Sequence, residues 1–197
     1  MSNKAAATMD RQGRDRRSER TQEALIDALI SLLTVKRYDA ISIKEIVDEA
    51  DVGRSTFYAH YQTKDDLLLA GLGRVLDALV EHVEINVPDR SVRWDTTWFF
   101  SHAKQHYELY RTLTWGSGFK LLIQDGHAAL SARLSKRLAP LASDSQESSV
   151  PLPILSYAMA GTLLLLLKWW LDNKMPYTPK RMDEIFHALV GPAVKTP

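Results

Sequence analysis

Residues 42–68 constrain the fold of this chain more than any other segment. Their sequence is SIKEIVDEADVGRSTFYAHYQTKDDLL, in which Ser42 is followed three residues later by Glu45. This spacing predicts a capping box, where each of the two side chains binds a free backbone amide at a helix start. Asp51 and Gly53 then interrupt the helical pattern, because Asp tolerates a left-handed backbone and Gly is an acceptable helix cap. The segment therefore predicts two short helices joined by a tight turn.

Two short helices joined in this way form a helix-turn-helix, whose second helix fits the major groove of DNA. The second helix is expected to run from Arg54 to Tyr61. Thr63 caps the next helix, and Asp65 and Asp66 suit its positive end. The segment thus predicts a regulator that binds double-stranded DNA.

The rest of the chain is also expected to be helical. Apolar residues recur at helical spacing, and no run alternates apolar and polar residues as a strand does. We expect a first helix from residue 18 or 21 to 36, a linking helix over 63–85, and later helices over 91–113, 119–141, 153–174 and 182–190. The expected fold class is all-α: an N-terminal three-helix DNA-binding domain with a helix-turn-helix, plus a larger C-terminal helical ligand-binding and dimerisation domain.

Three regions are expected along the chain. Residues 1–18 form a disordered basic arm, residues 19–62 the helix-turn-helix domain, and residues 63–197 the linking helix with the regulatory and dimerisation domain. Five arginines lie between Arg11 and Arg20, against Asp15 and Glu19. Such an arm is either a solvated tail or a contact to phosphates and the minor groove. The two interpretations are compatible, because such arms order only on DNA.

Composition excludes several other classes. The chain has no cysteine, so disulfides, thiolate metal sites and cysteine nucleophiles are absent, in agreement with a cytoplasmic protein. The polar N-terminus is not a secretory signal. The most apolar run, Ala158–Leu167, has ten residues and is too short to cross a bilayer, so no membrane partner is expected. No nucleophile elbow, phosphate-binding glycine loop or apolar carboxylate pair indicates an enzyme, and no cofactor is expected.

The sequences ISIKEI at Ile41–Ile46 and ADVGRSTFYAHYQTKDDLL at Ala50–Leu68 resemble the tetracycline-repressor-like (TetR) family of bacterial transcriptional regulators. The resemblance covers about 50 residues, from Thr21 to Leu72. Two positions depart from the family pattern: Asp51 replaces the usual turn glycine, and Gly53 replaces the usual capping serine. Both satisfy the same backbone need. The resemblance implies regulation of transcription and leaves the ligand of the C-terminal domain open.

The expected DNA contacts fall into two groups. Arg54, Ser55 and Thr56 begin the second helix and are expected to read base edges. Tyr58, His60, Lys64, Ser42 and Lys44 are expected to contact phosphates from the flank or start of a helix. Residues 42–64 contain three basic and four acidic residues. Affinity is therefore expected from geometry, helix ends and the basic arm. Phe57 and Tyr61 are expected to be core residues.

Reading a palindrome requires two copies, so a homodimer is expected. The interface is expected on the last two helices, in a four-helix arrangement with two helices from each subunit. The candidate residues are Leu163, Leu164, Leu167, Trp170, Leu171, Ile185, Phe186 and Leu189. The same residues are also candidates for the core of the monomer.

Residues 94–119 are rich in aromatic side chains, as a pocket for a planar or apolar small molecule would be. The candidate lining residues are Trp94, Trp98, Phe99, His102, His106, Tyr110, Trp115 and Phe119. Aromatic core packing is the alternative. His102 and His106 share a helix face, yet no third ligand lies near them in sequence, so no metal site is expected.

These patterns together predict a dimeric repressor that a small-molecule effector releases from a palindromic operator. The effector would shift the linking helix and change the spacing of the two DNA-reading helices. A regulator controlled by a protein partner, or an activator, is the alternative.

Overall fold

The computed structural model describes residues 2–86, 91–114, 116–142 and 150–194. The chain divides into two compact units, Met1–Gly71 and Leu72–Pro197. Helix α4, Lys64–Glu81, contributes residues to both units. Each unit is described by itself below.

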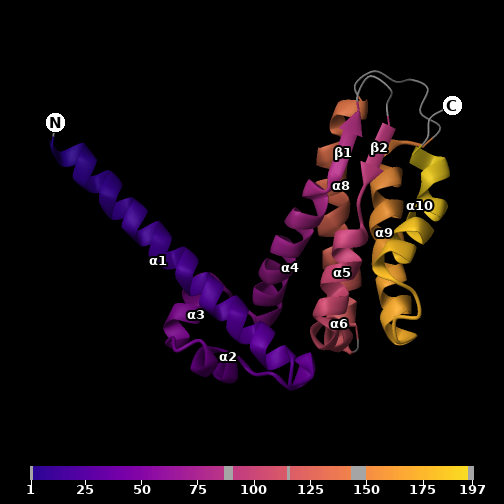
Figure 1. Cartoon of the computed structure of the whole chain (residues 1–197). Coiled ribbons are helices and arrows are strands. Elements are labelled where there is room, and N and C mark those ends of the chain that lie inside the picture. Colours follow the sequence, from indigo (N-terminus) through magenta and orange to yellow (C-terminus); the bar gives the residue numbers. More distant parts are fainter. Residues whose placement is uncertain (1, 87–90, 115, 143–149, 195–197) are drawn as a thin grey trace. The chain divides into compact units, whose positions relative to one another are not determined.

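The first unit contains the predicted helix-turn-helix (Figure 1). Its elements are α1 (Ser2–Leu33), the 3₁₀ turn η1 (Tyr38–Ala40), α2 (Ile43–Glu49), α3 (Arg54–His60) and the beginning of α4. Buried side chains of α1 such as Leu25 and Leu29 belong to the same small core as Ile46 of α2 and Phe57 of α3. The core explains why two helices of seven residues each, too short to be stable alone, hold their place.

Helix α1 begins much earlier than the sequence predicts. It starts at Ser2, so residues 2–18, expected as a disordered arm, are helical. Ala and Arg, which favour helix, are frequent in this stretch, and no Pro interrupts it. The expectation of a disordered arm relied on the polar, arginine-rich composition, which is evidence about packing and not about backbone conformation.

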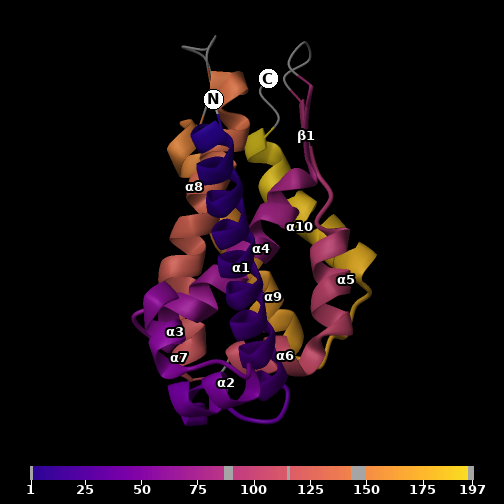
Figure 2. The same ribbon diagram turned by 90° about the vertical axis from the view of Figure 1, so that its left-hand side faces the viewer.

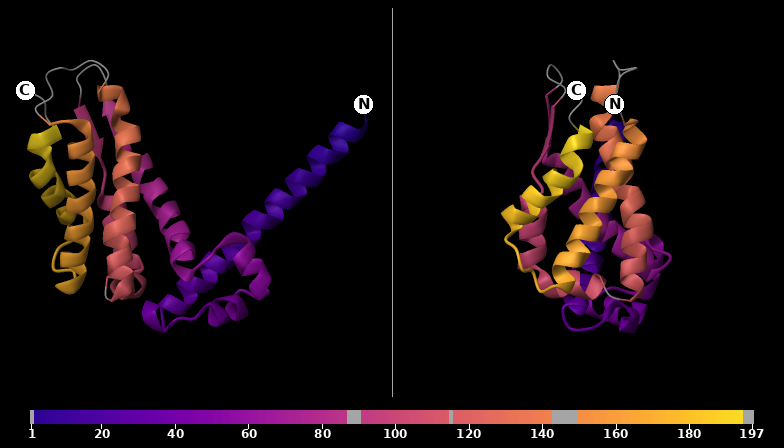
Figure 3. Two further views of the ribbon diagram at one scale, coloured as in Figure 1. Left: turned by 180° about the vertical axis from the view of Figure 1, so that it is seen from behind. Right: turned by 90° about the vertical axis from the view of Figure 1, so that its right-hand side faces the viewer.

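The second unit is a helical bundle with one small hairpin. After α4 come β1 (Val83–Asn86), β2 (Ser91–Trp94), α5 (Thr97–Gln105), α6 (Tyr107–Leu113), α7 (Ser117–Leu121), the π-helical turn η2 (Leu122–Gly126), α8 (His127–Ala142), α9 (Leu152–Asp172) and α10 (Pro179–Val194). Helix α8 lies beside α9 (Figure 2), and α9 lies beside α10 (Figure 3). The predicted linker at 144–153 lies largely outside the described residues. The mostly helical architecture confirms the expected fold class.

The hairpin of β1 and β2 was not expected. The strands are antiparallel, with Val83 opposite Trp94 and Ile85 opposite Val92. β-Branched and aromatic residues pair well across strands, which favours extended backbone where a continued helix was expected to reach residue 85. The indole of Trp94 donates to the backbone oxygen of Leu79 at 2.9 Å, and this bond fixes the hairpin against the end of α4.

Two arginines of α8 hold the second half of α4. Arg133 Nε donates to Asp77 Oδ1 at 2.6 Å, and this contact lowers the pKa of the Asp77 carboxyl. Arg137 donates twice to the backbone oxygen of Val83, at 3.1 and 2.8 Å. These bonds satisfy a carbonyl just past the end of α4, where no helical amide follows to bind it.

Helix α9 is longer than the ten-residue apolar run seen in the sequence. Its 21 residues are long and apolar enough to cross a membrane by length and composition alone. Core helices of soluble proteins pass the same test, and 44% of its most apolar stretch is buried within the protein. The other part of its surface is exposed and apolar, and its residues are described below.

Candidate nucleic-acid interface

The start of α2 is capped as the sequence predicts. The amide of Glu45 donates to Ser42 Oγ at 3.3 Å, and the Ser42 amide donates back to Glu45 Oε2 at 3.0 Å. Lys36 also donates to Glu45. The Lys36 ammonium and the donors of Ser42 lower the pKa of the Glu45 carboxyl to about 2. The hydrogen bonds of the capping box thus favour the ionised form of Glu45.

The turn between α2 and α3 also follows the sequence argument. Asp51 has a φ of 52°, in the left-handed region where Asp is tolerated. Gly53 has an extended backbone and is the N-cap of α3, with its oxygen accepting from Thr56 N at 3.0 Å. The Asp and Gly substitutions that distinguish this turn from the family pattern both keep the expected geometry.

Helix α3 separates its side chains into a buried and an exposed set. Phe57 is fully buried and its ring contacts the edge of the Tyr58 ring, while the Tyr58 side chain itself is 57% exposed. Arg54 and Ser55 are exposed at the first turn of α3, and Thr56 is half-buried. The predicted base-reading residues thus begin the helix and face outward. Phe57, with Tyr61 behind it, is confirmed as part of the core.

Besides Ser42, which binds Glu45, three of the predicted phosphate contacts have partners within the protein. His60 Nδ1 lies 3.4 Å from Gln22 Nε2 of α1, and its side chain is half-buried. Lys44 forms an exposed ion pair with Asp48 at 2.8 Å, which solvent and salt screen. Lys64 donates to the backbone oxygens of Tyr38 and Ile41. The contacts of His60 and Lys64 could not be predicted from the sequence, because their partners are more than twenty residues away.

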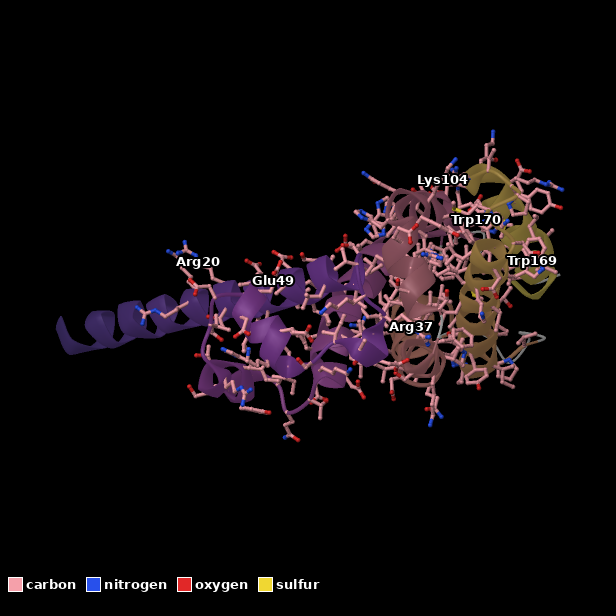
Figure 4. The ribbon with its side chains drawn as sticks, turned by 90° about the horizontal axis from the view of Figure 1, so that it is seen from below. Arg20, Arg37, Glu49, Lys104, Trp169 and Trp170 are labelled. Carbon is pink, nitrogen blue, oxygen red and sulfur yellow. The ribbon has the colours of Figure 1, made fainter. Side chains whose placement is uncertain are left out.

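The basic residues of α1 lie on its exposed surface. Figure 4 shows the side chain of Arg20 projecting from this helix, and Arg16 and Arg17 are exposed as well. These three guanidinium groups supply positive charge in the same unit as α3. Arg11 and Arg14, predicted with them, lie where the structure describes only the backbone.

The aromatic residues predicted to line a pocket are partly core and partly half-exposed. Trp94, Phe99 and Tyr110 are buried in the core of the second unit, whereas Trp98 and Phe119 pack against its edge. Trp115 lies outside the described residues. Some of the predicted residues are therefore core residues, and others remain candidates for lining a pocket.

A row of rings runs along α5. The ring centroids of Trp98 and His102 are 5.2 Å apart, and those of His102 and His106 are 4.5 Å apart. His102 Nδ1 lies 2.9 Å from the Tyr110 hydroxyl. Burial, and then the neighbouring His106, lowers the pKa of His102 and favours its neutral imidazole. Among the described residues no group of three potential ligands is placed to hold a metal ion.

A surface pocket of about 410 Å³ lies elsewhere in the second unit, between β2, the start of α5 and α10. Its lining is Val92, Arg93, Trp94, Asp95, Thr97, Lys180, Asp183, Glu184 and His187. Asp183 accepts from both the amide and the hydroxyl of Thr96, at 2.8 and 2.7 Å, so it holds α10 to the start of α5. Of the predicted pocket residues only Trp94 takes part.

The predicted interface residues lie mostly inside the monomer. Six of them are buried in the core of the second unit, namely Leu163, Leu164, Leu167, Trp170, Leu171 and Phe186. Ile185 is half-buried, and Leu189 is 61% exposed. Trp170 and its neighbour Trp169 differ sharply (Figure 4): Trp170 packs edge-on against Phe100, whereas Trp169 is exposed and stacks on Tyr177.

The exposed apolar side chains of α9 form a different set. Ile154, Tyr157, Leu165 and Trp169 are all exposed, and Leu165 is 58% exposed. With Gly161 between them, these positions recur every three to four residues and share one side of the helix. We call Ile154, Tyr157, Leu165 and Trp169 the outer stripe of α9.

Replacing Ser42 with alanine is expected to destabilise the first unit by about 1 kcal/mol, because the Glu45 amide loses its cap. Chemical denaturation followed by circular dichroism measures this change. Ser55→Ala, an exposed serine in the first turn of α3, is the matched control and should change stability by less than about 0.5 kcal/mol. Equal effects of the two substitutions would contradict the capping role.

Comparison with known proteins matches the helix-turn-helix region to a family of regulators. The model of bacterial regulatory proteins of the tetR family matches residues 25–70, which contain α2, α3 and the start of α4. YxbF, an uncharacterized HTH-type transcriptional regulator of Bacillus subtilis, is 38% identical over 72 residues. That match covers 36% of this chain and 19% of YxbF, so this chain matches only a small part of that protein's length.

Solved structures match over most of the length. A TetR transcriptional regulator from Streptococcus agalactiae has a TM-score of 0.59 and 23% identity, covering 91% of this chain and 98% of that one. NalD, the secondary repressor of the MexAB-OprM multidrug efflux pump in Pseudomonas aeruginosa, has a TM-score of 0.58 and 19% identity, covering 89% and 97%. At these identities the likeness concerns the fold, including the C-terminal helices. Together with the capped helix-turn-helix, these matches identify residues 25–70 as the DNA-binding domain of a TetR-family helix-turn-helix transcriptional regulator, a family of regulators and not of enzymes.

Proposed function

We propose that this regulator acts as a homodimer on a palindromic DNA operator, represses transcription there, and leaves the operator when a small molecule binds its C-terminal region. The observation that carries the proposal is the side-chain arrangement of α3. Arg54 and Ser55 are exposed at its first turn while Phe57 anchors its other side. A helix held in this way presents its N-terminal residues to base edges in a major groove.

The roles of the individual residues follow from their exposure. Arg54 is assigned to guanine, whose O6 and N7 accept a forked pair of hydrogen bonds. Ser55 and Thr56 complete the base contacts. Ser42, Lys44 and Tyr58 are assigned to phosphates, and His60 approaches the same backbone from the end of α3. Arg16, Arg17 and Arg20 of α1 add the electrostatic attraction that residues 42–64 lack.

The outer stripe of α9 supports a homodimer, in which a second copy of this chain covers the exposed apolar side chains. A half-buried helix as apolar as α9 leaves Leu165 and Trp169 in water unless something covers them. A second copy related by two-fold symmetry offers the same apolar face. Leu189, exposed on α10 beside α9, is a further candidate for this interface. The proposed interface thus keeps the predicted helices and replaces most of the predicted residues.

The aromatic residues of α5 and α6 support the effector part of the proposal. The stacked rings of half-buried Trp98 and His102 offer an aromatic surface to a planar ligand, and the hydrogen-bonded pair of His102 and Tyr110 supplies polar recognition. Tryptophan fluorescence tests this: planar aromatic compounds that release DNA should also change the emission of wild-type protein and not that of Trp98→Phe. Compounds that release DNA with identical emission changes in both proteins would place the effector elsewhere.

Substituting Arg54 with alanine is expected to weaken operator binding by about 1–3 kcal/mol, or roughly 5- to 150-fold, and to relax specificity at one base pair. Fluorescence anisotropy against the DNA upstream of the gene, with a scrambled duplex beside it, measures both effects. Lys44→Ala is the control: a phosphate contact should weaken binding to both duplexes equally. If Arg54→Ala also weakened both duplexes equally, Arg54 would not read bases.

An activator or a regulator controlled by a protein partner is the second candidate. In vitro transcription from the bound promoter distinguishes them, because a repressor lowers the yield of transcript and an activator raises it. The proposed location is the cytoplasm, where bacterial DNA lies. The proposed division of labour keeps DNA reading in residues 19–62 and assigns regulation and dimerisation to residues 63–197.

A further inference from the structure

The ammonium of Lys64 is bound inside the first unit. Lys64 is the first residue of α4, and its side chain is half-buried. Its Nζ donates to the backbone oxygen of Tyr38 at 2.9 Å and to that of Ile41 at 2.8 Å. The same Nζ lies 4.5 Å from the centre of the Tyr38 ring. A compact ammonium with three donors suits two converging carbonyls and an aromatic face.

Tyr38 completes this cluster from the other side. Its ring is buried, and its hydroxyl donates to the carboxylate of Asp65, the residue that follows Lys64. Two consecutive residues of α4 therefore bind the segment at η1: Lys64 binds the carbonyls of Tyr38 and Ile41, and Asp65 binds the phenol of Tyr38. The contacts join segments that are 23 to 27 residues apart in the chain.

The carbonyl of Ile41 directly precedes Ser42, the N-cap of α2. Its peptide plane also contains the Ser42 amide, which binds Glu45. Fixing the oxygen of this peptide fixes the direction of its N–H, and with it the first turn of α2. That turn carries Ser42 and Lys44, the proposed phosphate contacts of α2.

We propose that Lys64 is a positioning residue for DNA binding, which holds the Ile41–Ser42 peptide so that the start of α2 meets a phosphate, and that Lys64 does not itself bind the DNA backbone. This inference rests on the proposed DNA-binding mode of α2. It replaces the phosphate contact that the sequence predicts for Lys64, because two of the three N–H donors of the ammonium are bound to carbonyls and the ammonium lies over the Tyr38 ring.

The first test needs no DNA. Lys64→Met keeps the apolar stem over Tyr38 and removes the donors. Hydrogen exchange measured by NMR should then become on the order of tenfold faster at the Ile46 and Val47 amides of α2, while the Leu29 amide in the middle of α1 stays unchanged. Tyr38→Phe, which removes only the bond to Asp65, should act in the same direction with a smaller change. Unchanged exchange at Ile46 in Lys64→Met would overturn the proposal whether or not the protein binds its operator.

The second test separates positioning from phosphate contact. A phosphate contact contributes about 0.9 to the slope of log affinity against log salt concentration. We expect Lys64→Met to lower affinity about tenfold with an unchanged slope, and the control Lys44→Met to reduce the slope by about 0.9. A slope reduced equally in both variants would make Lys64 a phosphate contact. Unchanged affinity, at a temperature where the variant is fully folded, would make its role purely structural. Failure of the wild-type protein to bind DNA would instead refute the proposed function and leave the exchange result standing.

Discussion

Leu165→Glu is expected to convert the dimer into monomers and to lower affinity for a palindromic operator on the order of 100-fold, because each half-site is then bound without help from the other. Leu165 lies in the middle of the outer stripe of α9 and is 58% exposed in the single chain. In a dimer the new carboxylate would be buried against its own symmetry mate. Burying two unpaired like charges costs far more than the contacts of one leucine contribute.

Sedimentation velocity and DNA titration measure the two parts of this prediction separately. Ser101→Glu, an exposed residue of α5, introduces the same charge outside the outer stripe and should leave both measurements unchanged. Circular dichroism should show an equally helical protein in both variants, because Leu165 does not belong to the core. A Leu165→Glu protein that remains dimeric would remove α9 from the interface.

Phe57→Ala is expected to cost about 3–5 kcal/mol, as deletion of a fully buried aromatic ring does. Phe57 has no exposed surface, and its ring lies 5.4 Å from that of Tyr58 and 5.9 Å from that of Tyr61. The first unit is small, and domains of this size have little stability to spare. Loss of this amount should unfold the helix-turn-helix and abolish DNA binding at every salt concentration.

The matched control is the next residue. Tyr58→Ala removes a ring that is mostly exposed, so stability should change by less than about 0.5 kcal/mol while DNA affinity falls. Denaturant unfolding followed by near- and far-ultraviolet circular dichroism distinguishes the two variants. A similar loss of stability in both would mean that α3 is anchored by something other than Phe57.

The helix-turn-helix was predictable because its signals are local. Ser42 and Glu45 are three residues apart, and Asp51 determines the backbone of its own turn, so the sequence itself contains both partners. His60 and Lys64 were assigned to phosphates for the opposite reason. Their partners, Gln22 and the Tyr38 carbonyl, are 38 and 26 residues away, and no periodicity reveals them.

Helix α9 shows a second limit. Leucines and tryptophans occur on all its sides, so its pattern predicts burial and cannot say which side is covered by α8 and α10 of the same chain. The structure buries Leu163 and Trp170 and exposes Leu165 and Trp169. The hairpin Val83–Trp94 was missed because four-residue strands are too short for alternation to be recognised.

The division of α3 into a buried and an exposed set has a consequence for how such a regulator can diverge. Phe57 anchors α3 in the core, and Arg54 and Ser55 are exposed, so substitutions at these two positions leave the core unchanged. After a gene duplication, one copy can therefore acquire a new operator through single substitutions at these positions without first losing its fold. We expect paralogues of this protein to differ most within α3 at its solvent-facing positions, and to keep an aromatic ring at position 57.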